Sequence, residues 1–158
     1  MASLIFTGAM MSYRLKRRDV FLGETMMFIL QVSVEIEYIN LPLLEILKKT
    51  SAGNCCRSLD FLNHCVDAFE KGEDFSVCWE SSVEGSLLPM KKEERQKLKS
   101  LGDLLGTSDV AGQKNVLSLY GSYFSAYHEK AVKEYEKYGK MYVTLGVVLG
   151  TGIFILMM

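Results

Sequence analysis

The chain has 158 residues, which is enough for one domain with appended segments. Charged residues make up 23% and apolar residues 49%, a balance that excludes both a disordered chain and one wholly buried in a membrane. The formal net charge of −1 gives no electrostatic argument for nucleic acid, so we expect no nucleic-acid partner.

The N-terminal residues 1–13 carry no charge, and a basic cluster containing Arg14, Arg17 and Arg18 follows them. This run is shorter than the ~20 residues that a membrane-spanning helix needs. A secretory signal would carry its basic cluster before the apolar run, not after it. We predict a short N-terminal membrane segment, with three alternatives open: an interfacial anchor, a tight span, or a span whose beginning is absent from this sequence.

The C-terminal residues 141–158 also contain no charged residue. At ~1.5 Å per residue they would span roughly 27 Å as a helix, close to the thickness of the hydrocarbon core of a bilayer. We predict a transmembrane helix here, and the alternative is a buried core helix. Basic residues flank both apolar ends on the inside, so residues 14–140 are expected to form a cytosolic domain at the cell membrane.

Residues 22–39 can be interpreted in two ways. Apolar residues recur there at three- and four-residue steps from Leu22 onward, which indicates a helix. Between Val32 and Tyr38 the same residues also alternate with polar ones, which is typical of a strand. We favour the helix because its pattern is continuous. Pro42 should end it, and a short helix is expected over 43–49.

Two further helices are expected after a loop over residues 50–54. Ser58 is the expected N-cap of the first and Asp74 of the second, because their side chains can accept hydrogen bonds from free backbone N–H groups. Gly72 should separate the two helices. The side chains expected to face inward are Leu59, Leu62, Val66 and Phe69 in the first helix and Phe75, Cys78 and Trp79 in the second.

The last part of the chain predicts two more helices separated at Gly106, with Asp109 opening the second. The first should turn Leu98, Leu101, Leu104 and Leu105 inward. The second carries a heptad-like, tyrosine-rich stripe. Its members are Val110, Gln113, Leu117, Tyr120, Phe124, Tyr127, Ala131, Tyr135 and Tyr138. Together these patterns predict an all-α helical bundle.

The sequence shows no arrangement of catalytic residues. The adjacent pair Cys55–Cys56 does not match zinc-site spacing, and no phosphate-binding glycine loop occurs. We therefore expect no enzymatic activity, no metal and no cofactor. The acids Glu35, Glu37, Glu93 and Glu94 are expected on solvated helix faces. The charged run 91–99 has no evident internal use, so its cations Lys91, Lys92 and Arg95 are candidate partner-binding residues.

Three segments resemble the stage III sporulation protein AB family. Residues 35–45 match its E-I-x-Y-x-x-x-P-L-x-E segment, Gly72 to Glu80 its G…W-E segment, and residues 101–113 its L-G-x-x-L-G-x-x-D-x-x-x-Q signature. The residues that carry the resemblance are Glu35, Tyr38, Pro42, Trp79, Gly102, Gly106, Asp109 and Gln113. One departure is that the family has a full N-terminal membrane helix, which here is about ten residues short of the usual requirement.

The resemblance implies a membrane-anchored assembly component of the channel apparatus between mother cell and forespore, needed for endospore formation. It implies a domain similar to the helical domain of the type II secretion F platform protein, on the mother-cell side. The implied partners are the stage III sporulation AA ATPase, other channel subunits, membrane lipid and further copies of the chain. The alternative function is a tail-anchored cytosolic adaptor unrelated to secretion.

Overall fold

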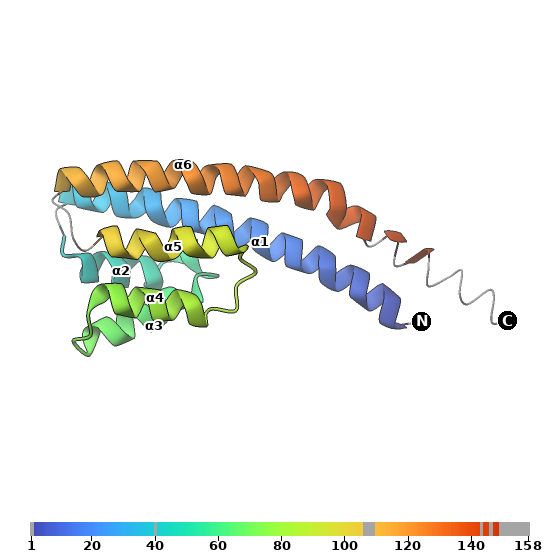
Figure 1. The fold of residues 1–158 in the computed structure, drawn as a ribbon, viewed down its shortest axis with the longest axis horizontal. Helices are drawn as coiled ribbons and strands as arrows, with labels where there is room; N and C mark the ends of the chain where they lie inside the picture. The colour runs from blue at the N-terminus through green and yellow to red at the C-terminus, as the bar shows by residue number, and fades with distance from the viewer. Residues whose placement is uncertain (1, 40, 106–109, 143, 146, 149–158) are drawn as a thin grey trace.

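Two long antiparallel helices, α1 and α6, run side by side through the molecule (Figure 1). The computed structural model describes residues 2–39, 41–105, 110–142, 144, 145, 147 and 148. Helix α1 spans Ala2–Val34 and continues into a π-helical turn, η1, over Glu35–Ile39. Helix α6 spans Val110–Glu134 and continues into a second π-helical turn, η3, over Tyr135–Gly139. Every regular element among the described residues is helical, which confirms the all-α class.

The shorter helices pack on one side of this pair, over the half that lies away from the N-terminus (Figure 1). Consequently, the other half of the α1–α6 pair projects beyond them. The elements of this side bundle, in chain order, are α2 (Leu43–Ala52), the 3₁₀ turn η2 (Asn54–Cys56), α3 (Asp60–Glu70), α4 (Phe75–Gly85) and α5 (Lys92–Leu105).

The core is centred on Trp79, whose side chain is fully buried. Its ring stacks with Phe28 of α1 at 5.9 Å between centroids and meets Phe61 of α3 edge-on at 5.3 Å. Its indole nitrogen donates a 2.7 Å hydrogen bond to the carbonyl of Leu98. A single side chain of α4 therefore contacts α1, α3 and α5, and the polar atom that it buries has a partner.

The helix prediction for residues 22–39 is confirmed, and the strand alternative is wrong. Four members of the apolar stripe are buried, namely Leu22, Ile29 and Val32 of α1 and Ile36 of η1. The last turn is π-helical, which shifts the helix face by one residue and brings Glu35 and Ile36 inward together. The short helix after Pro42 is also confirmed as α2.

The predicted helix ends are partly correct. Asp74 caps α4, accepting hydrogen bonds from the backbone N–H of Ser76 at 3.0 Å and of Val77 at 3.4 Å. Gly72 follows α3 with a φ of 88°, a left-handed conformation that favours glycine. Ser58 is not the N-cap of α3, because its N–H and hydroxyl both donate to Glu24 of α1 instead.

Two predictions about the side bundle are wrong in detail. Helix α2 extends to Ala52, so the expected loop over 50–54 begins later. Within it Thr50 is buried and its hydroxyl donates to the carbonyl of Ile46, which satisfies the polar group inside the helix. In α5 the leucines Leu98, Leu101 and Leu105 are buried as expected, but Leu104 is exposed.

The predicted N-terminal membrane segment coincides with the start of α1. The boundary expected after residue 13 falls inside α1, which has no break there. The expected transmembrane helix over 141–158 lies largely outside the described residues. Within the part of the chain that the structure describes, no helix combines the length and the apolar character needed to cross a bilayer. The expectation of membrane segments therefore stays a prediction.

Candidate functional site

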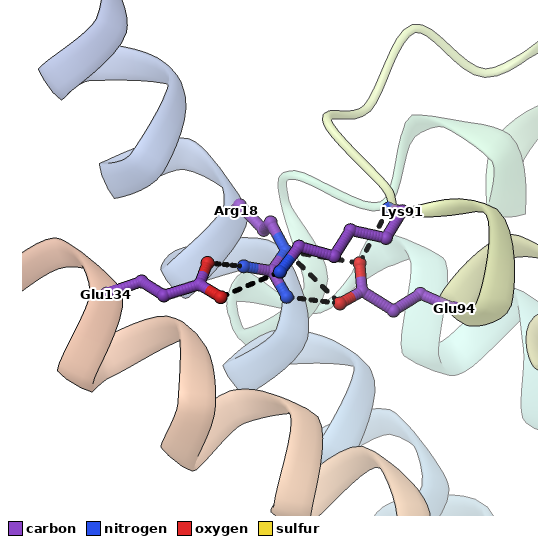
Figure 2. A network of polar contacts seen from close by, with 4 residues as sticks. All are labelled: Arg18, Lys91, Glu94 and Glu134. Carbon is purple, nitrogen blue, oxygen red and sulfur yellow. Dashed lines mark hydrogen bonds and ion pairs between the residues drawn. The ribbon is translucent and has the colours of Figure 1, made fainter.

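A network of four charged side chains joins α1, α5 and α6 where the side bundle ends (Figure 2). Its centre is Arg18 of α1, which is only 6% exposed. The Arg18 Nε atom lies 3.1 Å and 3.2 Å from the two carboxylate oxygens of Glu94, and one Nη atom pairs with the same carboxylate. The other Nη atom lies 2.5 Å from Oε2 of Glu134 in α6.

Lys91, the residue that precedes α5, completes this network. Its Nζ atom lies 2.7 Å from Oε1 of Glu134, and its backbone N–H donates to Glu94 at 2.8 Å. Two cations and two carboxylates therefore balance each other. Glu94 is 1% exposed, so the expectation of a solvated Glu94 is wrong: the guanidinium of Arg18 compensates for the loss of water around this carboxylate.

The network shifts the pKa values of Arg18 and Glu134 toward their charged forms. Burial opposes the charge of Arg18, but the hydrogen bonds and charges of Glu94 and Glu134 outweigh it and raise the pKa of the guanidinium. The hydrogen bond from Lys91 lowers the pKa of Glu134, and the charges of Arg18 and Lys91 add to this effect against the opposing burial. This arrangement therefore has a structural role. The four side chains form an electrically neutral clamp across three helices, made up of Arg18, Lys91, Glu94 and Glu134.

A groove of about 670 Å³ lies next to this clamp, between the first half of α1 and the α4–α5 loop. Tyr142, which follows η3, closes it on the side of α6. Most of its lining is apolar, and basic side chains stand among the apolar ones. The side chains that line it are Met10, Met11, Tyr13, Arg14, Leu15, Arg17, Arg18, Leu87, Leu88, Pro89, Met90, Lys91 and Tyr142.

Several residues singled out in the sequence meet around Trp79. A Cβ atom added at Gly102 of α5 would lie 2.1 Å from Cδ1 of Trp79, so only glycine lets the indole approach this closely. Gln113 of α6 donates from its amide to the carbonyl of Leu105 at 2.8 Å, which satisfies a free carbonyl at the end of α5. Gly106 and Asp109, between these two helices, lie outside the described residues.

The sequence pattern of a family described as Stage III sporulation protein AB matches residues 1–158. The chain belongs to this family. Membership implies a role in stage III sporulation and in its machinery. Comparison with curated proteins and with solved structures finds no match. The resemblance to the stage III sporulation protein AB family is thus confirmed, and the match covers the whole sequence.

The remaining residues that resemble the stage III sporulation protein AB family lie at the end of α1 opposite to the N-terminus. Glu35 is buried and pairs with Lys49 of α2, so the expectation of a solvated Glu35 is wrong. Tyr38 of the π-helical turn is 76% exposed. Pro42 precedes α2, and its carbonyl accepts the first helical hydrogen bonds. Glu35 and Pro42 therefore have structural roles, while the Tyr38 ring faces solvent.

The three candidate partner-binding cations do not form one free surface. Lys91 belongs to the clamp. The guanidinium of Arg95 donates to the carbonyls of Val83, Glu84 and Ser86, and so closes the end of α4. The prediction that this run has no internal use is wrong for both residues. Lys92 is exposed and forms no ion pair with any residue that the structure describes.

The contacts that join Arg18, Glu94 and Glu134 were not predicted from the sequence. His128 of α6 also has a partner in α1, because its Nε2 atom lies 3.1 Å from Oδ1 of Asp19. A signal was present: Arg18 lies four residues before the buried Leu22, and Glu94 four residues before the buried Leu98, so each continues an inward-facing stripe. Among the described residues, no cluster of three His, Cys, Asp or Glu side chains could hold a metal ion.

Proposed function

We propose that this protein is a membrane-anchored assembly component of the channel apparatus between mother cell and forespore, and that it docks the associated secretion-type ATPase rather than catalysing a reaction. The observation that supports this most is the antiparallel pairing of α1 and α6. Because of it, the start of α1 and the described residues after η3 lie at the same end of the molecule (Figure 1). Family membership favours this function over an adaptor unrelated to sporulation.

The shared end of the pair has the side chains that a membrane-facing surface needs. Exposed apolar side chains there include Met10, Met11, Met141, Leu145 and Val148. Exposed basic residues follow on the inner side of both helices. An exposed apolar end bordered by cations suits the boundary between the hydrocarbon core and anionic headgroups, and the charge-free run 141–158 would continue into the bilayer.

The side bundle would then stand away from the membrane on a rigid support. Helix α6 alone has 25 residues, which corresponds to about 37 Å of helix. The clamp around Arg18 holds α5 to both long helices. An ATPase that binds the side bundle would gain local concentration and a fixed orientation toward the channel, without any chemistry in this chain.

The ATPase contact can be tested with Lys92, the one candidate cation that has no internal role in the described structure. Reversing Lys91 or Arg95 would break bonds that hold the fold together. We expect Lys92→Glu to reduce recovery of the ATPase when the tagged full-length chain is purified from sporulating cells, most strongly at low salt, because the contact is electrostatic.

Lys71→Glu, an exposed cation at the end of α3, is the matched control and should leave recovery unchanged. Equal recovery with both variants at every salt concentration would exclude the start of α5 as the docking surface. If the wild-type chain recovered no ATPase at all, ATPase docking itself would be wrong. Extraction of the chain from membranes by alkaline carbonate would contradict the membrane anchor separately.

A further inference from the structure

The groove beside the α4–α5 loop has two cations that nothing in the described structure neutralises. Arg14 and Arg17 lie three residues apart on α1, so they share a helix face, and both line the groove. Neither forms an ion pair with the residues that the structure describes. By contrast, the two other cations of the groove, Arg18 and Lys91, are held by Glu94 and Glu134. The groove therefore carries a net positive charge.

Exposed apolar side chains surround these two arginines. Leu87, in the loop between α4 and α5, is 89% exposed. Met10, Met11 and Tyr13 on α1 are exposed as well and line the same groove. A small hydrophilic anion would use the arginines but would leave this apolar surface in water. The combination fits a ligand with an anionic group next to a hydrocarbon part.

We propose that this groove binds the headgroup of an anionic phospholipid of the membrane, with Arg14 and Arg17 on the phosphate and Leu87 and the methionines against the upper part of the acyl chains. Guanidinium groups hold phosphate oxygens through paired hydrogen bonds. A volume of about 670 Å³ is within the range that suits a ligand of this size. The inference rests on the proposed membrane anchor, which would bring the groove to the bilayer surface.

Lipid binding can be measured on the full-length chain purified in a non-ionic detergent. Leu87→Trp supplies a reporter in the groove, because the native Trp79 is fully buried and its emission should stay constant. The chain is titrated with phosphatidylglycerol, with phosphatidylcholine and with inorganic phosphate. We expect saturable binding of phosphatidylglycerol, with a blue shift of the reporter, and much weaker binding of the other two.

The double variant with Arg14→Gln and Arg17→Gln, which removes both positive charges, should weaken phosphatidylglycerol binding by roughly ten-fold or more, since two basic contacts to the anionic lipid are lost. The control pair Lys71→Gln and Lys130→Gln removes the same charge from exposed sites outside the groove and should leave binding unchanged. Circular dichroism would show that both pairs fold, because all four side chains are exposed.

Three outcomes would overturn the inference. Equal binding of phosphatidylglycerol and phosphatidylcholine would show that the groove does not select charge. Equal effects of the two variant pairs would show that binding is not at Arg14 and Arg17. Phosphate binding as tight as that of the anionic lipid would show a site for a free anion. None of these outcomes depends on whether the chain is anchored in the membrane. Carbonate extraction tests the anchor separately, so failure of the anchor can be distinguished from failure of lipid binding in the groove.

Discussion

At the scale of single residues, Arg18 differs from the basic residues beside it. Arg14 and Arg17 are exposed, whereas Arg18 is buried against Glu94. In the sequence all of them form one basic cluster, so composition alone assigns Arg18 to a flank of a membrane segment. Because Arg18 lies four residues before the buried Leu22, its side chain is expected to point inward. Only the structure shows that the carboxylate of Glu94 lies next to it there. A buried ion pair is therefore hard to predict when its two members are 76 residues apart.

Removing the cation should destabilise the fold strongly. We expect Arg18→Ala to lower the free energy of unfolding by about 3–5 kcal/mol, because it leaves the carboxylate of Glu94 buried without its partner. Arg17→Ala, on the exposed face of the same turn, should change stability by less than about 0.5 kcal/mol. Chemical denaturation followed by circular dichroism measures both. Similar losses in the two variants would contradict the clamp.

Glu134 should make stability depend on acid pH. Its pKa is lowered in the folded state, so it contributes stability that is complete above the unfolded value of about 4.3 and is lost as the pH falls through the folded value. We expect the stability difference between the wild type and Glu134→Gln to be constant at neutral pH and to shrink below about pH 4. A difference that grew on acidification would show that this carboxylate is not paired.

At the scale of helices, the packing of α4 on α5 explains part of the family signature. Gly102 is needed because Trp79 lies directly over it, and Gln113 is needed because its amide binds the last turn of α5. Both positions were noticed in the sequence through resemblance, without a physical reason. The reason requires the two helices to be packed, since Trp79 and Gly102 are distant along the chain.

Gly102→Ala should therefore destabilise the protein although alanine favours helices. The added methyl group would clash with the indole of Trp79, so we expect a loss of about 1–3 kcal/mol in the free energy of unfolding. Gly85→Ala is the matched control, because nothing lies within 4 Å of its added Cβ atom, and it should be neutral or slightly stabilising. Thermal unfolding of both variants measures these changes. If Gly102→Ala did not change stability, α4 and α5 could move apart at little cost in free energy.

Helix ends were predictable where the signal is local. Asp74 and Gly72 act through neighbouring backbone groups, and both were predicted correctly. Ser58 has the right chemistry for a cap, but Glu24 from another helix takes its donors. The π-helical turns at Glu35–Ile39 and Tyr135–Gly139 were not predicted, because one extra residue in a turn leaves the apolar pattern nearly unchanged.

At the scale of the whole molecule, periodicity predicted which faces are buried but not which helices meet. The stripes of α1 and α6 were both recognised, and Leu117, Tyr120, Phe124 and Ala131 are indeed buried. The pairing of these two helices along their length could not be predicted. The sequence shows that each apolar stripe must be buried, but it does not show which other stripe covers it. The groove escaped prediction for the same reason, since its walls come from α1, the α4–α5 loop and Tyr142.

The proposed topology makes a prediction about thiol labelling. Burial raises the pKa of Cys65 to about 12, and burial together with a hydrogen bond between Cys56 and Cys55 raises that of Cys56 to about 12, so neither should react readily. Cys55 is only partly buried and should react first. A membrane-impermeant maleimide should label the chain only after cells are permeabilised, and Cys55→Ser should remove most of that labelling. Labelling of Cys55 in intact cells would place the domain on the outer side.

The clamp also constrains how this sequence can change through evolution. Arg18 and Glu94 are buried together, so a substitution at either position alone leaves the charge of the other residue buried without a partner. Selection should remove such a single variant before a second substitution can restore the stability of the fold. Lys91 and the partly exposed Glu134 tolerate loss more easily, since water can replace the missing partner. Related sequences should therefore inherit Arg18 and Glu94 as a pair, or replace both by apolar residues, while Lys91 and Glu134 drift more freely.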